Sequence, residues 1–270
     1  EDAAAHVDDK WERAFAAADA VRDEVAARVG ARADEIALGA STHDLLLRML
    51  SAFDLAGRPH LVTTRGEFHS ITRQLERLDE DGVIRVTWVD PHPVSTLAER
   101  LGAEIGPKTA AVLVSTVLFE TSSVVPGIRG LVGRARGFGA EVLLDAYHAF
   151  YAVPFDLAAL GAEDAFLVGG GYKYAQWGEG VCFLRVPPRE AGWRPVITGW
   201  FAGFADLASR TPGRVHYARA GKDAFAGATY DPVSHYRARA VVRFMKEQGM
   251  TAAALRALAE RLTRRITDGL

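Results

Sequence analysis

Apolar residues along this chain recur in two alternating patterns. In the longer segments they return every three or four positions among charged and small residues, which predicts amphipathic helices. These helical segments are residues 8–29, 44–55, 71–79, 94–105, 131–138, 232–248 and 251–267. Between them stand short apolar runs of the kind that form buried strands. These runs are residues 35–38, 60–64, 83–89, 110–117, 141–144, 166–168 and 181–186.

Alternation of helix and strand predicts parallel strand pairing with helices on both faces of the sheet. We therefore expect a three-layer α/β/α fold with a mostly parallel sheet. No repeat, linker or low-complexity tract interrupts residues 35–187. We divide the chain into an N-terminal helical segment (1–34), a large domain (35–250) and the start of a C-terminal helical region (251–270).

Polar side chains stand where several of these strands end. Asp145 ends one apolar strand, Lys173 follows another after a short glycine turn, and Ser41-Thr42 lies between a strand and the next helix. Ligands of open α/β sheets bind outside the carboxyl ends of the strands. We therefore expect these residues to open onto one edge of the sheet.

Lys173 stands between two tyrosines, directly after Gly169-Gly170-Gly171. A partly desolvated lysine has a lowered pKa and can form a Schiff base with a carbonyl group. Alternatively, a lysine at a strand end extends its amine into water. Taken alone, the sequence around Lys173 favours this second interpretation.

The other positions also have structural alternatives. Asp145 would cap a following helix, and Ser41-Thr42 would cap the helix that starts near residue 44. A capped helix start is at the same time an anion site. Phe68 and His69 would ordinarily be core or rim residues.

Taken together, these groups match the requirements of pyridoxal 5′-phosphate (PLP). Lys173 would hold the aldehyde carbon, and Asp145 would keep the pyridine nitrogen protonated, so that the ring acts as an electron sink. The helix start at Ser41-Thr42 would bind the phosphate. An aromatic side chain such as Phe68 would stack on the ring.

Residues 35–250 resemble the fold-type I PLP enzymes of the class V aminotransferase group, and kynureninase most closely. The motifs that carry this resemblance are Ser41-Thr42-His43-Asp44-Leu45-Leu46-Leu47-Arg48-Met49-Leu50-Ser51, Phe68-His69-Ser70, Asp145-Ala146-Tyr147-His148, Gly171-Tyr172-Lys173-Tyr174 and Gly199-Trp200-Phe201. They resemble, in order, the phosphate-loop helix, a Phe-Pro-Ser segment, an Asp-Leu-Ala-His motif, the Tyr-Lys-Tyr of the Schiff-base site and a Gly-Trp-Phe segment.

The resemblance implies roles for these residues. Lys173 and Tyr172 would be catalytic, and Tyr172 would also reach the phosphate. The cofactor would be bound by Ser41, Thr42, Phe68, Asp145, His148, Tyr172 and Lys173. Trp200, which in kynureninases serves the neighbouring subunit's site, would contact the substrate, as would Thr229. The resemblance also implies a homodimer.

Departures from the kynureninase pattern weaken the assignment of a substrate. Ile71 replaces an expected aspartate, and Thr229 or Tyr230 stands where an asparagine is expected. The small C-terminal domain of the family, with its carboxylate-binding arginine, is absent or truncated in this sequence. Arg194, Arg214 and Arg219 are the remaining candidates for that arginine.

The implied reaction is hydrolytic Cβ–Cγ cleavage of kynurenine to anthranilate and alanine. A class V aminotransferase or lyase acting on another amino acid is the alternative. A cysteine desulfurase requires a reactive cysteine, whereas Cys182 lies in an apolar strand. A scaffold that kept the fold without activity would not need both Lys173 and Asp145.

Bulk composition excludes several other classes. A formal net charge of −2 in 270 residues leaves no basic field for nucleic acid or acidic membranes. No apolar run approaches the roughly 20 residues that span a bilayer, and no signal peptide is visible. With a single cysteine we expect no disulfide and no metal site. We expect a cytoplasmic enzyme.

Overall fold

Seven strands form one sheet within residues 2–207 and 213–269, the part of the chain that this computed structural model describes. Their order across the sheet is β1-β7-β6-β5-β4-β2-β3. The strands are β1 Ile36–Gly39, β2 His60–Thr64, β3 Arg85–Val89, β4 Thr109–Ser115, β5 Glu141–Asp145, β6 Phe166–Gly170 and β7 Cys182–Arg185. All except the edge strand β3 consist almost entirely of buried residues.

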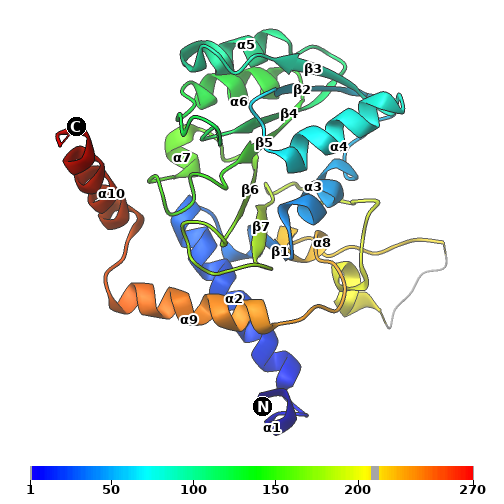
Figure 1. Cartoon of the computed structure of the whole chain (residues 1–270). Coiled ribbons are helices and arrows are strands. Elements are labelled where there is room, and N and C mark those ends of the chain that lie inside the picture. Colours follow the sequence, from blue (N-terminus) through cyan, green and yellow to red (C-terminus); the bar gives the residue numbers. More distant parts are fainter. Residues whose placement is uncertain (1, 208–212, 270) are drawn as a thin grey trace.

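Helices cover both faces of the sheet. They are α1 Asp2–Ala5, α2 Lys10–Val29, α3 Thr42–Leu50, α4 His69–Glu80, α5 Leu97–Ala103, α6 Ile128–Gly137, α7 Leu157–Leu160, α8 Gly221–Ala224, α9 Val233–Glu247 and α10 Ala252–Thr267, with 3-10 turns η1 Ala33–Glu35, η2 Val94–Thr96 and η3 Trp200–Asp206. Apolar side chains of α2, α5 and α6 pack on one face, and those of α3 and α4 on the other (Figure 1). The predicted three-layer fold is confirmed.

Strand β7 departs from the parallel pattern. It runs antiparallel to both neighbours, β6 and β1, whereas the other strand pairs are parallel. The segment joining β6 to β7 contains no helix, and a parallel return requires a crossover connection of a dozen or more residues, usually helical. Because β7 is reversed, β1 points in the same direction as β6.

The glycines before Lys173 belong partly to strand β6, so the expected turn directly after residue 168 was wrong. Gly169 pairs with Phe183, and Gly170 with Cys182. A Cβ on Gly169 would lie 2.6 Å from Cζ of Phe183, and one on Gly170 would lie 2.6 Å from Cε2 of Tyr147. These two glycines leave room for aromatic rings that lie against the strand.

Helix α2 shares the main core with the sheet. Its small apolar side chains, among them Ala17, Val21 and Val25, are fully buried. The buried carboxylate of Glu24 accepts hydrogen bonds from Oη of Tyr151 (2.5 Å) and Nε of Arg28 (2.7 Å), and Nζ of Lys246 lies 2.9 Å from it. These contacts join α2 to α9 and to the segment after β5. The domain division at residues 34 and 250 stays a prediction.

Several helices differ from their predicted bounds. The helix expected over 44–55 ends at Leu50, because Ser51 and Asp54 favour turns. Oγ of Ser51 donates to the carbonyl of Arg48 at 2.8 Å, and the amide of Gly57 donates to Oδ1 of Asp54 at 2.9 Å. Helices α7 and α8 each span four residues, too few to give a visible period.

Two further properties bear on function. In the described ranges, 2–207 and 213–269, no helix combines the length and the apolar character needed to cross a membrane. Within the same ranges, histidine, cysteine and acidic side chains form no group of three or more that could hold a metal ion.

Candidate active site

The predicted polar residues do meet at one edge of the sheet. Asp145 is the last residue of β5, Lys173 follows β6, and Ser41 follows β1. Strands β1, β5 and β6 point the same way, so their carboxyl ends lie on the same side. The structure thus places the three predicted residues at the same edge of the sheet, and their role in ligand binding stays a prediction.

The amine of Lys173 is held among rings rather than extended into water. Its Nζ hydrogen-bonds to Nε2 of His148 and lies 5.3 Å from the ring centroid of Phe68 and 5.1 Å from that of Tyr147. Burial lowers the pKa of Lys173, and the nearby Asp145 carboxyl partly opposes this shift. An ammonium at Lys173 donates to a lone pair on Nε2 of His148, whereas a neutral amine can also accept from that nitrogen.

Asp145 lies at the buried end of the site. Only 7% of the residue is exposed, and its Oδ1 accepts the backbone N–H of Tyr147 at 2.7 Å. Burial raises the pKa of this carboxyl to about 6, against the lowering effects of that bond and of Lys173. A cationic or protonated ligand group beside Asp145 would therefore be strongly favoured.

Phe68 forms one wall of the site together with rings that the sequence analysis did not single out. It packs edge-on against Phe119 at 5.4 Å between centroids and lies 6.5 Å from the ring of His148. His69 contacts both Phe68 and Phe119. Phe119 follows β4, so the same strand-end rule could have found it. Phe68 remains 38% exposed and offers a free face for stacking.

A second buried carboxyl, Glu67, lies in the turn between β2 and α4 and contacts Ser115 of β4, the strand next to Asp145. Its Oε1 accepts the backbone N–H of Ser115 at 2.7 Å, and its Oε2 accepts the hydroxyl of Ser115 at 2.7 Å. Ser115 is the register partner of Asp145 in the sheet. Burial raises the pKa of Glu67 to about 7, and the charge of Asp145 adds to this rise. Sequence reasoning missed Glu67, because nothing local distinguishes it from a surface glutamate.

Replacing Glu67 with glutamine is expected to stabilise the cofactor-free protein at pH 8. Since folding raises this pKa from 4.5 to about 7, the free energy of unfolding falls as the pH rises through that interval. Glutamine keeps both bonds to Ser115 without a charge. The expected gain is about 1–3 kcal/mol at pH 8 and disappears near pH 4.

Urea unfolding of both proteins across this pH range measures the effect. Glu76→Gln, at an exposed position on helix α4, which follows Glu67, is the matched control and should change stability little. Equal stability of the native protein and Glu67→Gln at pH 8 would contradict the conclusion that burial of the ionised Glu67 side chain destabilises the fold.

The start of α3 lies at the other end of the site. Oγ of Ser41 accepts the backbone N–H of Asp44 at 3.1 Å, so Ser41 is the N-cap. The backbone N–H of Thr42 points to Sγ of Cys182. Both the capping and the anion-site interpretations of Ser41-Thr42 therefore remain compatible with the geometry.

Cys182 is a packed side chain of β7. It is 6% exposed, and burial raises the pKa of its thiol to about 12. A thiol in this state is a poor nucleophile. The interpretation of Cys182 as a core residue agrees with this placement.

The two tyrosines that flank the lysine point partly outward. Tyr172 is 53% exposed and Tyr174 46%. The catalytic role of Tyr172 that the resemblance implies stays a prediction.

Trp200 and Thr229 lie apart from the lysine in this chain. Trp200 packs on Phe201 and Phe204 in η3, with centroids 4.3 and 5.3 Å away, and is 44% exposed. Thr229 lines a cavity of about 770 Å³ between α2, the start of α3, η3 and the start of α9. Lys173 does not line this cavity. The two predicted substrate contacts are therefore not brought to Lys173 within one chain.

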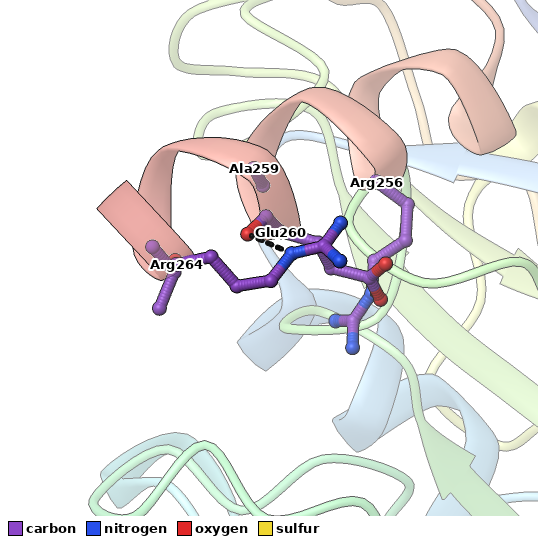
Figure 2. A pocket seen from close by; sticks show the side chains of 5 residues that line it. Arg256, Ala259, Glu260 and Arg264 are labelled. Carbon is purple, nitrogen blue, oxygen red and sulfur yellow. Dashed lines mark hydrogen bonds and ion pairs between the residues drawn. The ribbon is translucent and has the colours of Figure 1, made fainter. Parts of the chain in front are cut away.

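A shallow groove on α10 carries no comparable chemistry (Figure 2). Its charged side chains are paired along the helix itself: Nε of Arg256 lies 2.6 Å from Oε1 of Glu260, and Nε of Arg264 donates to the carbonyl of Glu260 at 3.4 Å. Such pairs are typical of an exposed helix surface.

Comparisons with known proteins agree with this geometry. The profile of the family described as "Aminotransferase class-V" matches residues 3–270. The uncharacterized aminotransferase YcbU of Bacillus subtilis is 26% identical over 90% of this chain and 69% of its own length. The kynureninase of Deinococcus radiodurans is 29% identical over 74% of this chain and 49% of its own length.

Among solved structures, the apo cysteine desulfurase of Thermococcus onnurineus NA1 superposes with a TM-score of 0.74 at 19% identity. The match covers 96% of this chain and 63% of that one. At this identity the likeness establishes the fold alone. The chain thus spans from about half to about two thirds of the length of these proteins.

Proposed function

The chain belongs to the class-V aminotransferase family, and we propose that it is a PLP-dependent enzyme that acts on an amino acid. One observation carries the proposal. Lys173 holds its amine, with a lowered pKa, beside the free face of Phe68 and within the electrostatic reach of the buried Asp145. An amine in this state is suited to bond covalently to a carbonyl carbon.

The donor groups present fit PLP. Asp145 would hold the proton on the pyridine nitrogen, and the Phe68 ring would stack on one face. The positive end of α3, at Ser41-Thr42, would take the phosphate. When bound, the cofactor supplies an electron sink for carbanion chemistry.

The chain's own residues then have distinct tasks. Lys173 would accept and return the proton at the substrate α-carbon, and burial, which lowers its pKa, favours the neutral amine. His148 would orient Nζ of Lys173 through its hydrogen bond. The surrounding rings of Phe68, Phe119 and His148 would restrict water around this amine.

Within this class, we favour kynureninase-like hydrolytic cleavage of the Cβ–Cγ bond. The Tyr172-Lys173-Tyr174 and Gly199-Trp200-Phe201 segments support it, together with the similarity to a kynureninase. Aminotransfer or lyase chemistry on another amino acid is the alternative, supported by the YcbU similarity over most of this chain. Desulfurase chemistry is less favoured, because Cys182 is buried with a raised pKa.

A homodimer would supply the residues that one chain keeps away from Lys173. Exposed aromatic side chains gather where α2 meets η3: Trp11, Phe15, Trp200 and Phe204 are each at least 37% exposed, and Phe15 contacts Phe201. A second copy seated there would cover this surface and would bring Trp200 towards the partner's site.

Adding L-kynurenine to the PLP-loaded protein is expected to release anthranilate, which is followed by its fluorescence. Trp200→Ala should raise KM, because the aryl group loses a stacking partner. Trp88→Ala, on the edge strand β3, is a control. If 2-oxo acid formation from an amino acid replaces anthranilate release, the aminotransferase alternative holds and kynureninase activity is rejected.

A further inference from the structure

Tyr147 lies close to several residues of the candidate site. Its backbone N–H holds Oδ1 of Asp145 at one end, at 2.7 Å. Its ring centroid lies 5.1 Å from Nζ of Lys173. Its Cζ, which carries the hydroxyl, and Sγ of Cys182 lie 2.9 and 2.8 Å from the same point, the position of a Cβ added to Gly170.

The hydroxyl of Tyr147 lies close to the first turn of α3. Sγ of Cys182, which lies beside the Tyr147 ring, also interacts with the backbone N–H of Thr42 in that turn. Burial raises the pKa of Tyr147, so the hydroxyl keeps its proton at neutral pH. A neutral phenol can donate a hydrogen bond to an anion placed there.

The large side chain of Tyr147 and the absent side chain of Gly170 are complementary in space. The family motif Asp-Leu-Ala-His has alanine where this chain has Tyr147. The neighbouring strand has Gly170, whose added Cβ would lie 2.6 Å from Cε2 of Tyr147 and 2.8 Å from Sγ of Cys182. The large ring therefore occupies space that the absent side chain of Gly170 leaves open.

We propose that Tyr147 is a cofactor-binding residue, whose ring forms a second wall of the site and whose hydroxyl donates a hydrogen bond to the phosphate of PLP. The proposal rests on the proposed function, since it needs PLP in this site. It extends the phosphate site from the backbone at Ser41-Thr42 to a side chain on the segment after β5.

Titration of the cofactor-free protein with PLP and with pyridoxal, which lacks the phosphate, tests this proposal. Binding is followed by visible absorbance and needs no turnover. Tyr147→Phe keeps the ring and removes the hydroxyl. This variant should weaken PLP binding roughly tenfold or more, because a hydrogen bond to a charged group is lost. Pyridoxal affinity should stay as in the native protein.

Tyr147→Ala should weaken the binding of both PLP and pyridoxal, because it also removes the ring that forms the wall of the site. Tyr236→Phe, on α9, is the matched control and should change neither. An unchanged ratio of PLP to pyridoxal affinity in Tyr147→Phe overturns the inference while leaving the proposed function intact. A native protein that binds no PLP overturns both. Should Tyr147→Ala fail to fold, the Tyr147→Phe ratio alone decides.

Discussion

Replacing Lys173 with alanine should abolish the visible absorbance of the bound cofactor and lower turnover by roughly 10⁴-fold or more. The variant loses the amine that would bond to the cofactor and would move the α-proton. His148 cannot take over the role of the lysine amine. Its Nε2 contacts only Nζ of Lys173, and its ring packs near that of Phe119. Absorbance spectra and steady-state kinetics measure the two effects.

Lys108→Ala is the matched control. Nζ of Lys108 donates to the carbonyl of Gly57 at 3.3 Å on the exposed surface, so this variant should keep both the spectrum and the rate. Borohydride reduction should fix the cofactor to the native protein and not to Lys173→Ala. A yellow Lys173→Ala protein that is insensitive to borohydride would overturn the assignment of this lysine.

Asp145→Asn should have the second largest effect and should move activity and stability in opposite directions. Asparagine keeps an oxygen that can accept the Tyr147 amide, but it cannot carry the negative charge that holds a proton on the pyridine nitrogen. Turnover should fall by roughly 10²–10³-fold, as when a preorganised electrostatic partner is lost. The visible band should shift while the cofactor stays bound.

The cofactor-free Asp145→Asn protein should nevertheless be more stable than the native protein at pH 8. Folding raises the carboxyl pKa from 3.8 to about 6. Stability from this group is therefore present below pH 3.8 and is lost as the pH rises through 6. The expected gain is on the order of 1–3 kcal/mol. Urea unfolding of both cofactor-free proteins measures it, and a less stable variant at pH 8 would contradict the buried charge.

The sequence predicted the structure best where the local spacing of apolar residues determines whether a segment is a helix or a strand. Apolar runs and helical spacing located the strands and layers, and the strand-end rule then placed Asp145, Lys173 and Ser41 on one edge. The reversed direction of β7 was not visible, because pairing direction depends on the connection and not on the residues of the strand. The glycines of β6 were read as a turn, since only the packed rings of Phe183 and Tyr147 reveal why they lack side chains.

Residues that depend on tertiary burial escaped the sequence. Glu67 looks like a surface glutamate until Ser115 and Asp145 are brought beside it. Tyr147 stood inside a recognised motif, yet its reach to Cys182 depends on β7 lying beside β6. Thr229 lines a cavity that Lys173 does not line, and Trp200 packs on Phe201 and Phe204. The sequence could not show this placement, because it depends on how η3 and the loop before α9 pack.

The pairing of β1 with β7 also sets the order in which the site can assemble. Ile36 pairs with Arg185, so the strand that leads into α3 finds its partner only after most of the sheet has been synthesised. Contacts between such distant segments form late, since a long loop must close first. Asp145 and Lys173 can therefore come together on β5 and β6 before Ser41 arrives. A nascent chain would contain Asp145 and Lys173 in place, but not Ser41, until β1 pairs with β7. Tight binding of a phosphorylated cofactor would therefore begin only when the sheet is complete.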